Sequence, residues 1–239
     1  MAGSIEANLA IYNKQINKYC PPTLPELMDS SVFTLDFADR KSVTIGLDVV
    51  NGFEVTVRIM TSTRCVSISV DFLRRIFAML TNILSIITNP PVKSRERLFF
   101  KDDTISLTKM SYRGNNMLAI ESSLGDRVML NRQNLLTLQD TESCINETIV
   151  RKYAIVRPLV QGQLEQIAEY LKSDFYLEKT STVQDITAFI AGIHNDLITS
   201  GMARTCGGIP VQSYVAQIKR FASIQLADLW SMKLNASEV

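Results

Sequence analysis

The residue types that most often carry out catalysis are scarce in this chain. His194 is its single histidine, and no cysteine or second histidine lies at a metal-binding spacing from it. The sequence contains no phosphate-binding glycine loop and no Gly-x-Ser-x-Gly turn that would present a nucleophile. The cysteines are far apart and form no Cys-x-x-Cys pair, which favours free thiols over a disulfide scaffold: Cys20, Cys65, Cys144 and Cys206. We therefore expect no enzyme, no metal site and no cofactor.

Basic and aromatic side chains could instead bind a nucleic acid. Lys and Arg number 25 against 24 Asp and Glu, a net charge of +1, so a strongly basic polyelectrolyte binder is excluded and any such surface must be local. Residues 93–132 hold eight basic and five acidic side chains. The candidate nucleic-acid-binding residues are Lys101, Lys109, Tyr112, Arg113, Arg127 and Arg132, with Arg58 and Arg64 earlier in the chain.

The best local candidate is the predicted hairpin tip Tyr112-Arg113-Gly114-Asn115. A tyrosine there can stack on a base, and an arginine can contact a phosphate. Solvated hairpin charges and a tyrosine that covers the sheet edge explain the same residues, so both interpretations are open.

Hydrophobic periodicity divides the 239 residues into four segments. Residues 1–29 form a leader, 30–92 and 93–157 each follow the order β-β-β-β-α, and 158–239 are helical. The predicted fold class is therefore α+β: two tandem β-β-β-β-α units with curved antiparallel sheets, and a C-terminal helical segment.

Alternating apolar residues mark the strands, and helical spacing marks the helix that closes each unit. Asn51-Gly52 is a strong hairpin signal, and Asn131 is a candidate N-cap of the second helix. We expect Thr141-Glu142-Ser143 to break or restart that helix. The predicted strands are 32–37, 43–47, 55–59 and 66–70, then 97–101, 104–108, 117–121 and 127–130; the first helix is 72–87.

The sequences of the two units align with each other at an offset of 62 residues. The third strand fits less well, because Val57 falls on Ala119 and a shift of one residue would place it on Ile120, so we predict a bulge or slip there. The matched pairs are Val43/Ile105, Ile45/Leu107, Gly52/Gly114, Val66/Val128, Ile68/Leu130 and Leu73/Leu135.

Both ends of the chain are predicted to be helical. Residues 5–19 have helical spacing, and this leader helix either packs on its own domain or docks on another subunit. Near the other end, Thr182 is predicted to start a helix that stops at Gly201. Pro210 is predicted as the first residue of a last helix that runs toward Leu234.

The second unit resembles the eukaryotic single-stranded-DNA-binding transcriptional coactivators of the positive cofactor four family. The resemblance is carried by Ile105-Ser106-Leu107, Tyr112-Arg113-Gly114, the run from Gly125 to Asn131, and the helix end from Ile145 to Lys152. Two β-β-β-β-α units in one chain are also similar to the Whirly proteins, the mitochondrial guide-RNA-binding proteins and the purine-rich-element binders.

This resemblance implies a curved sheet that holds a single strand of DNA or RNA. Carried over residue by residue, it points to Tyr112 and Arg113 in the hairpin and to Arg127 before the last strand. It also implies a homodimer or larger oligomer, because the helices of the coactivators pair across subunits.

Two functions remain open from the sequence. The first is sequence-tolerant binding of single-stranded DNA or RNA in replication, transcription or genome handling. The second is an oligomeric scaffold or a viral virion or assembly protein that keeps the fold without strong nucleic-acid binding. The start of the sequence lacks a secretory signal and the longest uncharged run is too polar to span a bilayer, so we expect an intracellular protein of the nucleus or cytoplasm with no membrane partner and no small-molecule substrate.

Overall fold

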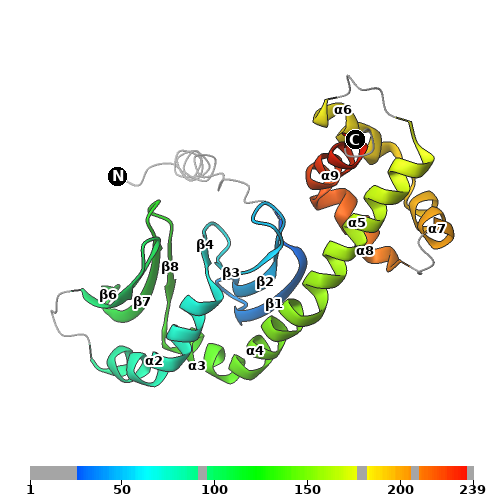
Figure 1. Cartoon of the computed structure of the whole chain (residues 1–239). Coiled ribbons are helices and arrows are strands. Elements are labelled where there is room, and N and C mark those ends of the chain that lie inside the picture. Colours follow the sequence, from blue (N-terminus) through cyan, green and yellow to red (C-terminus); the bar gives the residue numbers. More distant parts are fainter. Residues whose placement is uncertain (1–25, 91–95, 177–181, 206–209, 236–239) are drawn as a thin grey trace, which may run out of the picture. The chain divides into compact units, whose positions relative to one another are not determined.

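The computed structural model describes residues 26–90, 96–176, 182–205 and 210–235 (Figure 1). Within these residues the chain is α+β, with two four-stranded antiparallel sheets that are each followed by helices. The predicted fold class is confirmed. The predicted leader helix and the Gly207-Gly208 loop lie outside the described residues.

Two compact units make up the described chain, and each gathers segments that are distant in sequence. The first comprises Val32–Thr44 and Val57–Glu142. The second comprises Glu26–Ser31, Ile45–Thr56 and the described chain from Ser143 onward. The whole second sheet therefore lies in the first unit, and the C-terminal helices lie in the second.

The first sheet contains strands β1 (Met28–Asp36), β2 (Lys41–Asp48), β3 (Glu54–Met60) and β4 (Cys65–Ile68), in that spatial order. Strand β1 begins four residues before the predicted start at Val32. The polar residues that follow Met28 hide this part of the strand from a hydrophobicity pattern, although Met28 itself is fully buried.

The second sheet contains β5 (Arg97–Lys101), β6 (Ile105–Tyr112), β7 (Asn115–Ser122) and β8 (Arg127–Leu130), also in sequence order. Strands β6 and β7 pair without interruption along their whole length. The pairing of β5 with β6 shifts by one residue between Leu98 and Phe100, which is a β-bulge.

Strand pairing corrects the predicted register of the repeat. In the first sheet Ile59 pairs with Val66, and in the second Ile120 pairs with Val128. The fourth strands are 62 residues apart, whereas the third strands are 61 apart. The predicted slip is therefore present, but it runs in the opposite direction, so that Val57 corresponds to Leu118 rather than to Ile120.

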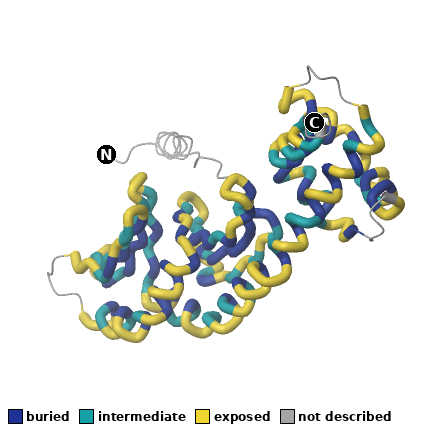
Figure 2. The backbone as a smooth tube through the Cα atoms, in the orientation of Figure 1, coloured by how far each residue is buried: buried dark blue, intermediate teal, exposed yellow. Residues whose placement is uncertain are grey.

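Helix α2 (Val70–Thr88) follows the first sheet in sequence and packs on the second (Figure 1). Its N-cap Ser69 accepts a hydrogen bond from the amide of Phe72, and the ring of Phe72 lies 4.8 Å from that of Phe100 on β5. Buried and exposed residues alternate along α2 at helical spacing, as Figure 2 shows. One face of the second sheet is therefore covered by a helix from the other repeat.

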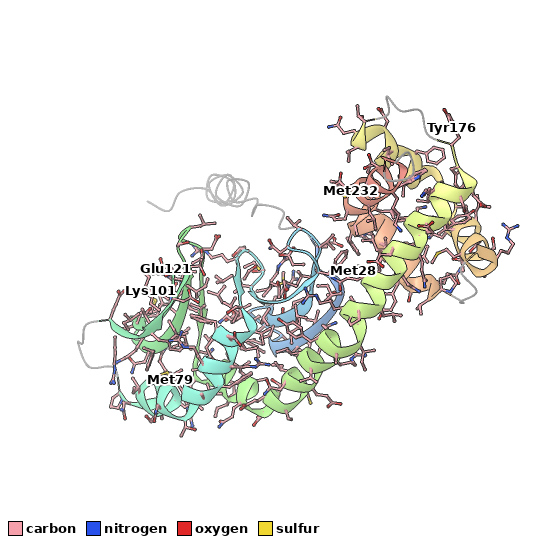
Figure 3. The ribbon with its side chains drawn as sticks, viewed as in Figure 1. Met28, Met79, Lys101, Glu121, Tyr176 and Met232 are labelled. Atoms are coloured by element: carbon pink, nitrogen blue, oxygen red, sulfur yellow. The ribbon has the colours of Figure 1, made fainter. Side chains whose placement is uncertain are left out.

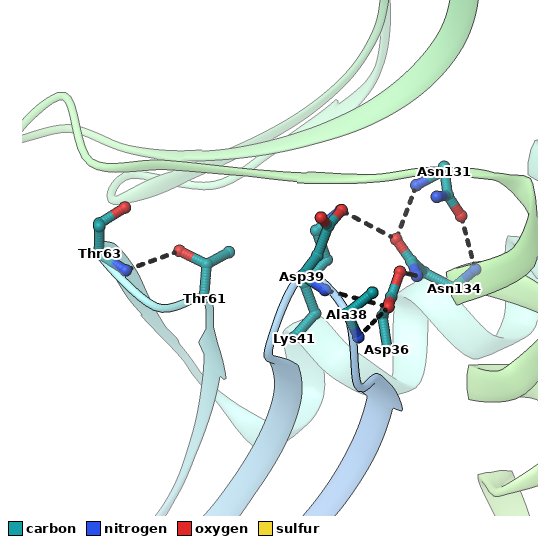
Figure 4. A network of polar contacts seen from close by, with 8 residues as sticks. All are labelled: Asp36, Ala38, Asp39, Lys41, Thr61, Thr63, Asn131 and Asn134. Atoms are coloured by element: carbon teal, nitrogen blue, oxygen red, sulfur yellow. Dashed lines mark hydrogen bonds and ion pairs between the residues drawn. The ribbon is translucent and has the colours of Figure 1, made fainter. Parts of the chain in front are cut away.

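Helix α3 (Arg132–Asp140) makes the reciprocal contact with the first sheet. It begins with the predicted cap Asn131, and it stops at Thr141 as the sequence predicted, before α4 (Glu142–Arg151). Asn134 in its first turn is fully buried and joins α3 to the β1–β2 turn (Figure 4).

Hydrogen bonds at Asn134 use both ends of its amide (Figure 4). Its Oδ1 accepts from Lys41 Nζ at 3.3 Å and from the Asn131 amide at 3.0 Å, and its Nδ2 donates to Asp36 Oδ2 at 3.3 Å. Lys41 also pairs with Asp39 at 3.0 Å. Hydrogen bonds, chiefly from the Asp39 amide, lower the pKa of Asp36, so its carboxylate stays charged to a lower pH than that of an ordinary aspartate.

In the second unit, one continuous run of helix comprises α4, a π-helical turn η1 (Lys152–Val156) and α5 (Arg157–Asp174). Lys152 in the π-helical turn is fully buried. Its ammonium forms an ion pair with the carboxylate of Asp29 at 2.8 Å and donates a hydrogen bond to the Asp29 carbonyl. Arg157 pairs with Glu54 at 2.8 Å. These ion pairs tie the helix to the segments of the first sheet that belong to this unit.

The C-terminal helices are shorter than predicted. The helix that starts at Thr182 has the predicted capping box, but α6 (Val183–Gly192) ends before His194, and α7 (Asn195–Thr205) runs through Gly201. A Cβ on Gly201 would lie 2.1 Å from the ring of Tyr170, so this glycine is needed for close packing and is not a helix stop.

The last predicted helix is two helices. Pro210 precedes α8 (Gln212–Phe221) by two residues instead of opening it, and Ala222 separates α8 from α9 (Ser223–Asn235). Trp230 on α9 is fully buried. Its ring lies 6.0 Å from that of Phe189 on α6, so these two helices share one core.

Asn134→Ala tests the contact between α3 and the first sheet. We expect it to lower the free energy of unfolding by about 1–3 kcal/mol, because it removes hydrogen bonds from buried polar groups. Urea denaturation followed by circular dichroism measures the change. Gln133→Ala, at the exposed neighbouring position, is the control and should change stability by less than about 0.5 kcal/mol. Equal effects of the two substitutions would contradict this role for Asn134.

Candidate nucleic-acid interface

The second sheet has two different faces, because side chains alternate along each strand and partners opposite each other share a face. The face toward α2 carries buried aliphatic residues, among them Leu107, Leu118 and Ile120. We call the other one the open face, and of its side chains only that of Ala119 is buried. Its residues are Leu98 and Lys101 on β5, Ser106, Thr108, Met110 and Tyr112 on β6, Asn115, Met117, Ala119 and Glu121 on β7, and Arg127 and Met129 on β8.

A polar row crosses one end of the open face. Lys101, Ser106, Glu121 and Arg127 are successive partners across the four strands. Arg127 donates from Nε and Nη2 to Oε2 of Glu121, at 3.0 and 2.7 Å, which compensates its charge. Lys101 is exposed, and Figure 3 shows it beside Glu121 on the sheet, away from Met79 of α2. Lys101 is therefore better placed than Arg127 to meet a phosphate.

The hairpin tip lies at the opposite end of β6. Arg113 and Gly114 have φ angles of 51° and 76°, the pair of left-handed conformations found in two-residue type I′ turns. Tyr112 is 43 % exposed, and the Arg113 guanidinium carbon lies 5.3 Å from the centre of its ring. A ring and a cation are thus presented together, as an unpaired base and its phosphate require.

Three methionines occupy the middle of the open face, and sequence reasoning missed them. Met110 lies directly opposite Met117, and Met129 lies opposite Ala119. All three methionines are half-buried. Alternation along the strands could have indicated them, because Met110 lies two residues before Tyr112 on β6 and so shares its face. The predicted alternation was used only to find the buried face of each strand.

The remaining candidate residues lie elsewhere. Lys109 is on the side of the sheet that faces α2, opposite Arg97, and Arg132 is the first residue of α3. Arg58 and Arg64 belong to the first sheet, where Arg58 is buried opposite Ser67 and Arg64 is exposed in the β3–β4 turn. The structure therefore places four candidates on the second sheet outside the α2 side, with Lys101 and Arg127 at one end and Tyr112 and Arg113 at the other, and it separates the other four from them.

The hairpin of the first sheet has a different role from that of the second. Its aromatic residue, Phe53, is buried, whereas Tyr112 is exposed. The neighbouring residues hold the C-terminal helices, since Gln225 donates to the Val49 carbonyl and Arg157 pairs with Glu54. Because this hairpin contacts the C-terminal helices, the hairpin of the second sheet is the better candidate for binding a ligand.

Metal-binding clusters and membrane-spanning helices are both absent from the described residues. In them, no group of three or more His, Cys, Asp or Glu side chains is arranged to hold a metal ion, and no helix is long and apolar enough to cross a bilayer. His194 lies between α6 and α7, not inside a helix as predicted, and its exposed ring is 3.2 Å from Asp196.

Comparisons with known proteins add no relationship. No protein-family model matches the chain, and no match was found among curated proteins or solved structures.

Cys65 occupies the position in the first sheet that Arg127 holds in the second, and its chemistry can be measured. Burial is the main cause that raises its pKa to about 11, so about one thiol in a thousand is ionised at pH 8. We expect iodoacetamide to alkylate exposed Cys144 much faster than Cys65, as followed by peptide mass mapping. The rate at Cys65 should rise with pH toward 11, and both sites should react alike in denaturant. Equal rates in the folded protein at pH 8 would refute this expectation.

Proposed function

We propose that this chain binds single-stranded DNA or RNA, with little sequence preference, on the open face of its second sheet. The observation that carries the proposal is the exposed Tyr112 ring with the Arg113 guanidinium beside it, at one end of a half-buried sheet face. Lys101 supplies a second cation at the other end.

The spacing of these groups suits an extended strand. Ser106, in the row of Lys101, and Tyr112 are six residues apart on β6, which is about 20 Å at the rise of a β-strand. Bases can stack on the tyrosine while phosphates contact the two cations. A duplex turns its bases inward and cannot offer their faces to the sheet, so the arrangement favours unpaired strands.

An oligomeric scaffold is the second candidate function. It is supported by the charge compensation between Arg127 and Glu121 and by large exposed apolar residues in the same unit, such as Leu98 and Leu124. Light scattering together with absorbance at 260 and 280 nm separates the two functions. A large assembly that retains no nucleic acid at low salt would favour the scaffold.

Substitutions in the hairpin test the binding site. Tyr112→Ala should weaken binding of labelled oligothymidylate or oligouridylate by about 5- to 100-fold, because stacking contributes about 1–3 kcal/mol per base. Arg113→Glu should also weaken binding, most strongly at low salt. Fluorescence anisotropy measures both effects.

Two matched variants control for the loss of a tyrosine and for the reversal of a charge. Tyr176→Ala removes a tyrosine that is 89 % exposed after α5, and Arg74→Glu reverses an exposed charge on α2. Both should leave affinity within about twofold of the wild type. If the hairpin variants bind as tightly as these controls, the proposed site is wrong.

Glu121→Gln should act in the opposite direction. It removes the carboxylate that compensates Arg127 and adds one positive charge to the open face. We expect tighter binding of the same oligonucleotides and a steeper dependence on salt, by about 0.7 in the slope of log affinity against log salt. An unchanged slope would show that Arg127 lies outside the path of the strand.

A further inference from the structure

The middle of the open face is made mainly of thioether and methyl groups, to which Thr108, the partner of both Leu98 and Ala119, adds one hydroxyl. Met110 and Met117 are direct partners in the register, and Met129 is the partner of Ala119 one strand further. Leu98 extends the same surface onto the edge strand β5, where it is 56 % exposed. We call Leu98, Met110, Met117, Ala119 and Met129 the methionine floor.

Charged groups lie at the two ends of the open face and not on this floor. Lys101 and the compensated pair of Arg127 and Glu121 form the row at one end, and Arg113 is at the hairpin tip. The methionine floor itself offers no charge-assisted hydrogen bond to a phosphate. Thioether sulfur does make favourable contacts with aromatic rings, and methionine adapts its shape to irregular partners.

From this separation we infer that the methionine floor binds the flat rings of unpaired bases, which supply most of the affinity, while the phosphates supply little of it. The inference rests on the proposed function and specifies which part of the nucleic acid is recognised. The strand lies with its bases against the floor and its backbone toward solvent, and it meets Lys101 and Arg113 at the two ends.

Salt dependence follows from the number of cations that meet phosphates. Two contacts, from Lys101 and Arg113, give a slope of about −1.4 in log affinity against log salt for a single strand. A strand held by six phosphate contacts would instead give a slope of about −4. The near-neutral net charge of +1 for the chain adds little long-range attraction.

The experiment uses the full chain with two probes of equal length, oligothymidylate and an abasic oligomer that has the same sugar-phosphate backbone without bases. Anisotropy titrations at several salt concentrations give the affinity and the slope for each probe. We expect the abasic oligomer to bind at least about tenfold more weakly, and oligothymidylate to show the shallow slope.

Paired variants locate the recognition on the floor. The double substitution Met110→Gln and Met117→Gln keeps the side-chain length but makes the floor polar, and it should weaken oligothymidylate binding by about tenfold or more. The matched control is Met79→Gln with Met232→Gln, on α2 and α9, which should bind like the wild type (Figure 3). Circular dichroism verifies that both double variants are folded, and the abasic comparison needs no variant.

The outcomes separate this inference from the function on which it rests. If the abasic oligomer binds as tightly as oligothymidylate, or if the slope is near −4, phosphates carry the affinity and the inference is overturned while single-strand binding stands. If a folded floor variant binds like the control, the bases lie elsewhere and the inference is likewise overturned. If neither probe binds at low salt, the proposed function itself fails.

Discussion

The uninterrupted register of β6 with β7 decides which side chains can act together in this protein. Because side chains alternate along a strand, a slip of one residue would exchange the open face with the face that packs on α2. The two-residue turn at Arg113 and Gly114 sets this register, since both residues have the positive φ angles that a type I′ turn requires. The same turn that presents Tyr112 therefore also aligns Met110 with Met117.

Packing explains why the hairpins of the two sheets differ in their exposed features. The first hairpin has one more residue between its glycine and the third strand, and Phe53 takes a positive φ angle of 62° there and is buried. Its neighbours hold α5 and α9 through Glu54 and Val49. Phe53 is buried in this hairpin and is not exposed to a ligand. The described contacts show no helix held in this way by the second hairpin, where Tyr112 is exposed.

The elements that a local pattern specifies could be predicted from the sequence. Period-2 alternation indicated the strands. Asn131 and Thr182 were predictable as N-caps because each exchanges hydrogen bonds only with a residue in the first turn of its own helix. The third-strand slip had the wrong direction, because residue matching cannot show which turn contains an extra residue. Gly201 was read as a stop because its packing against Tyr170 is a tertiary contact that no local pattern contains.

The candidate site was predictable only in part, for a related reason. Tyr112 and Arg113 were found because a hairpin tip is a local feature, but the roles of Lys109 and Arg127 depend on strand partners. Pairing places Lys109 on the side that faces α2 and gives Arg127 a carboxylate partner in Glu121. A count of basic residues between 93 and 132 therefore overestimates the charge available to a phosphate.

This reduced charge bears on the kind of selectivity that the open face can have. Thioether, methyl and tyrosine groups contact the faces of bases, and every base has such a face, so they discriminate weakly between sequences. Reading base edges would need several hydrogen-bonding side chains in the middle of the sheet, where the strands place Met110, Met117 and Met129 beside the single hydroxyl of Thr108. Phosphate contacts add no sequence information either. On the proposed function, a surface of this composition would distinguish unpaired from paired bases better than it distinguishes one base from another.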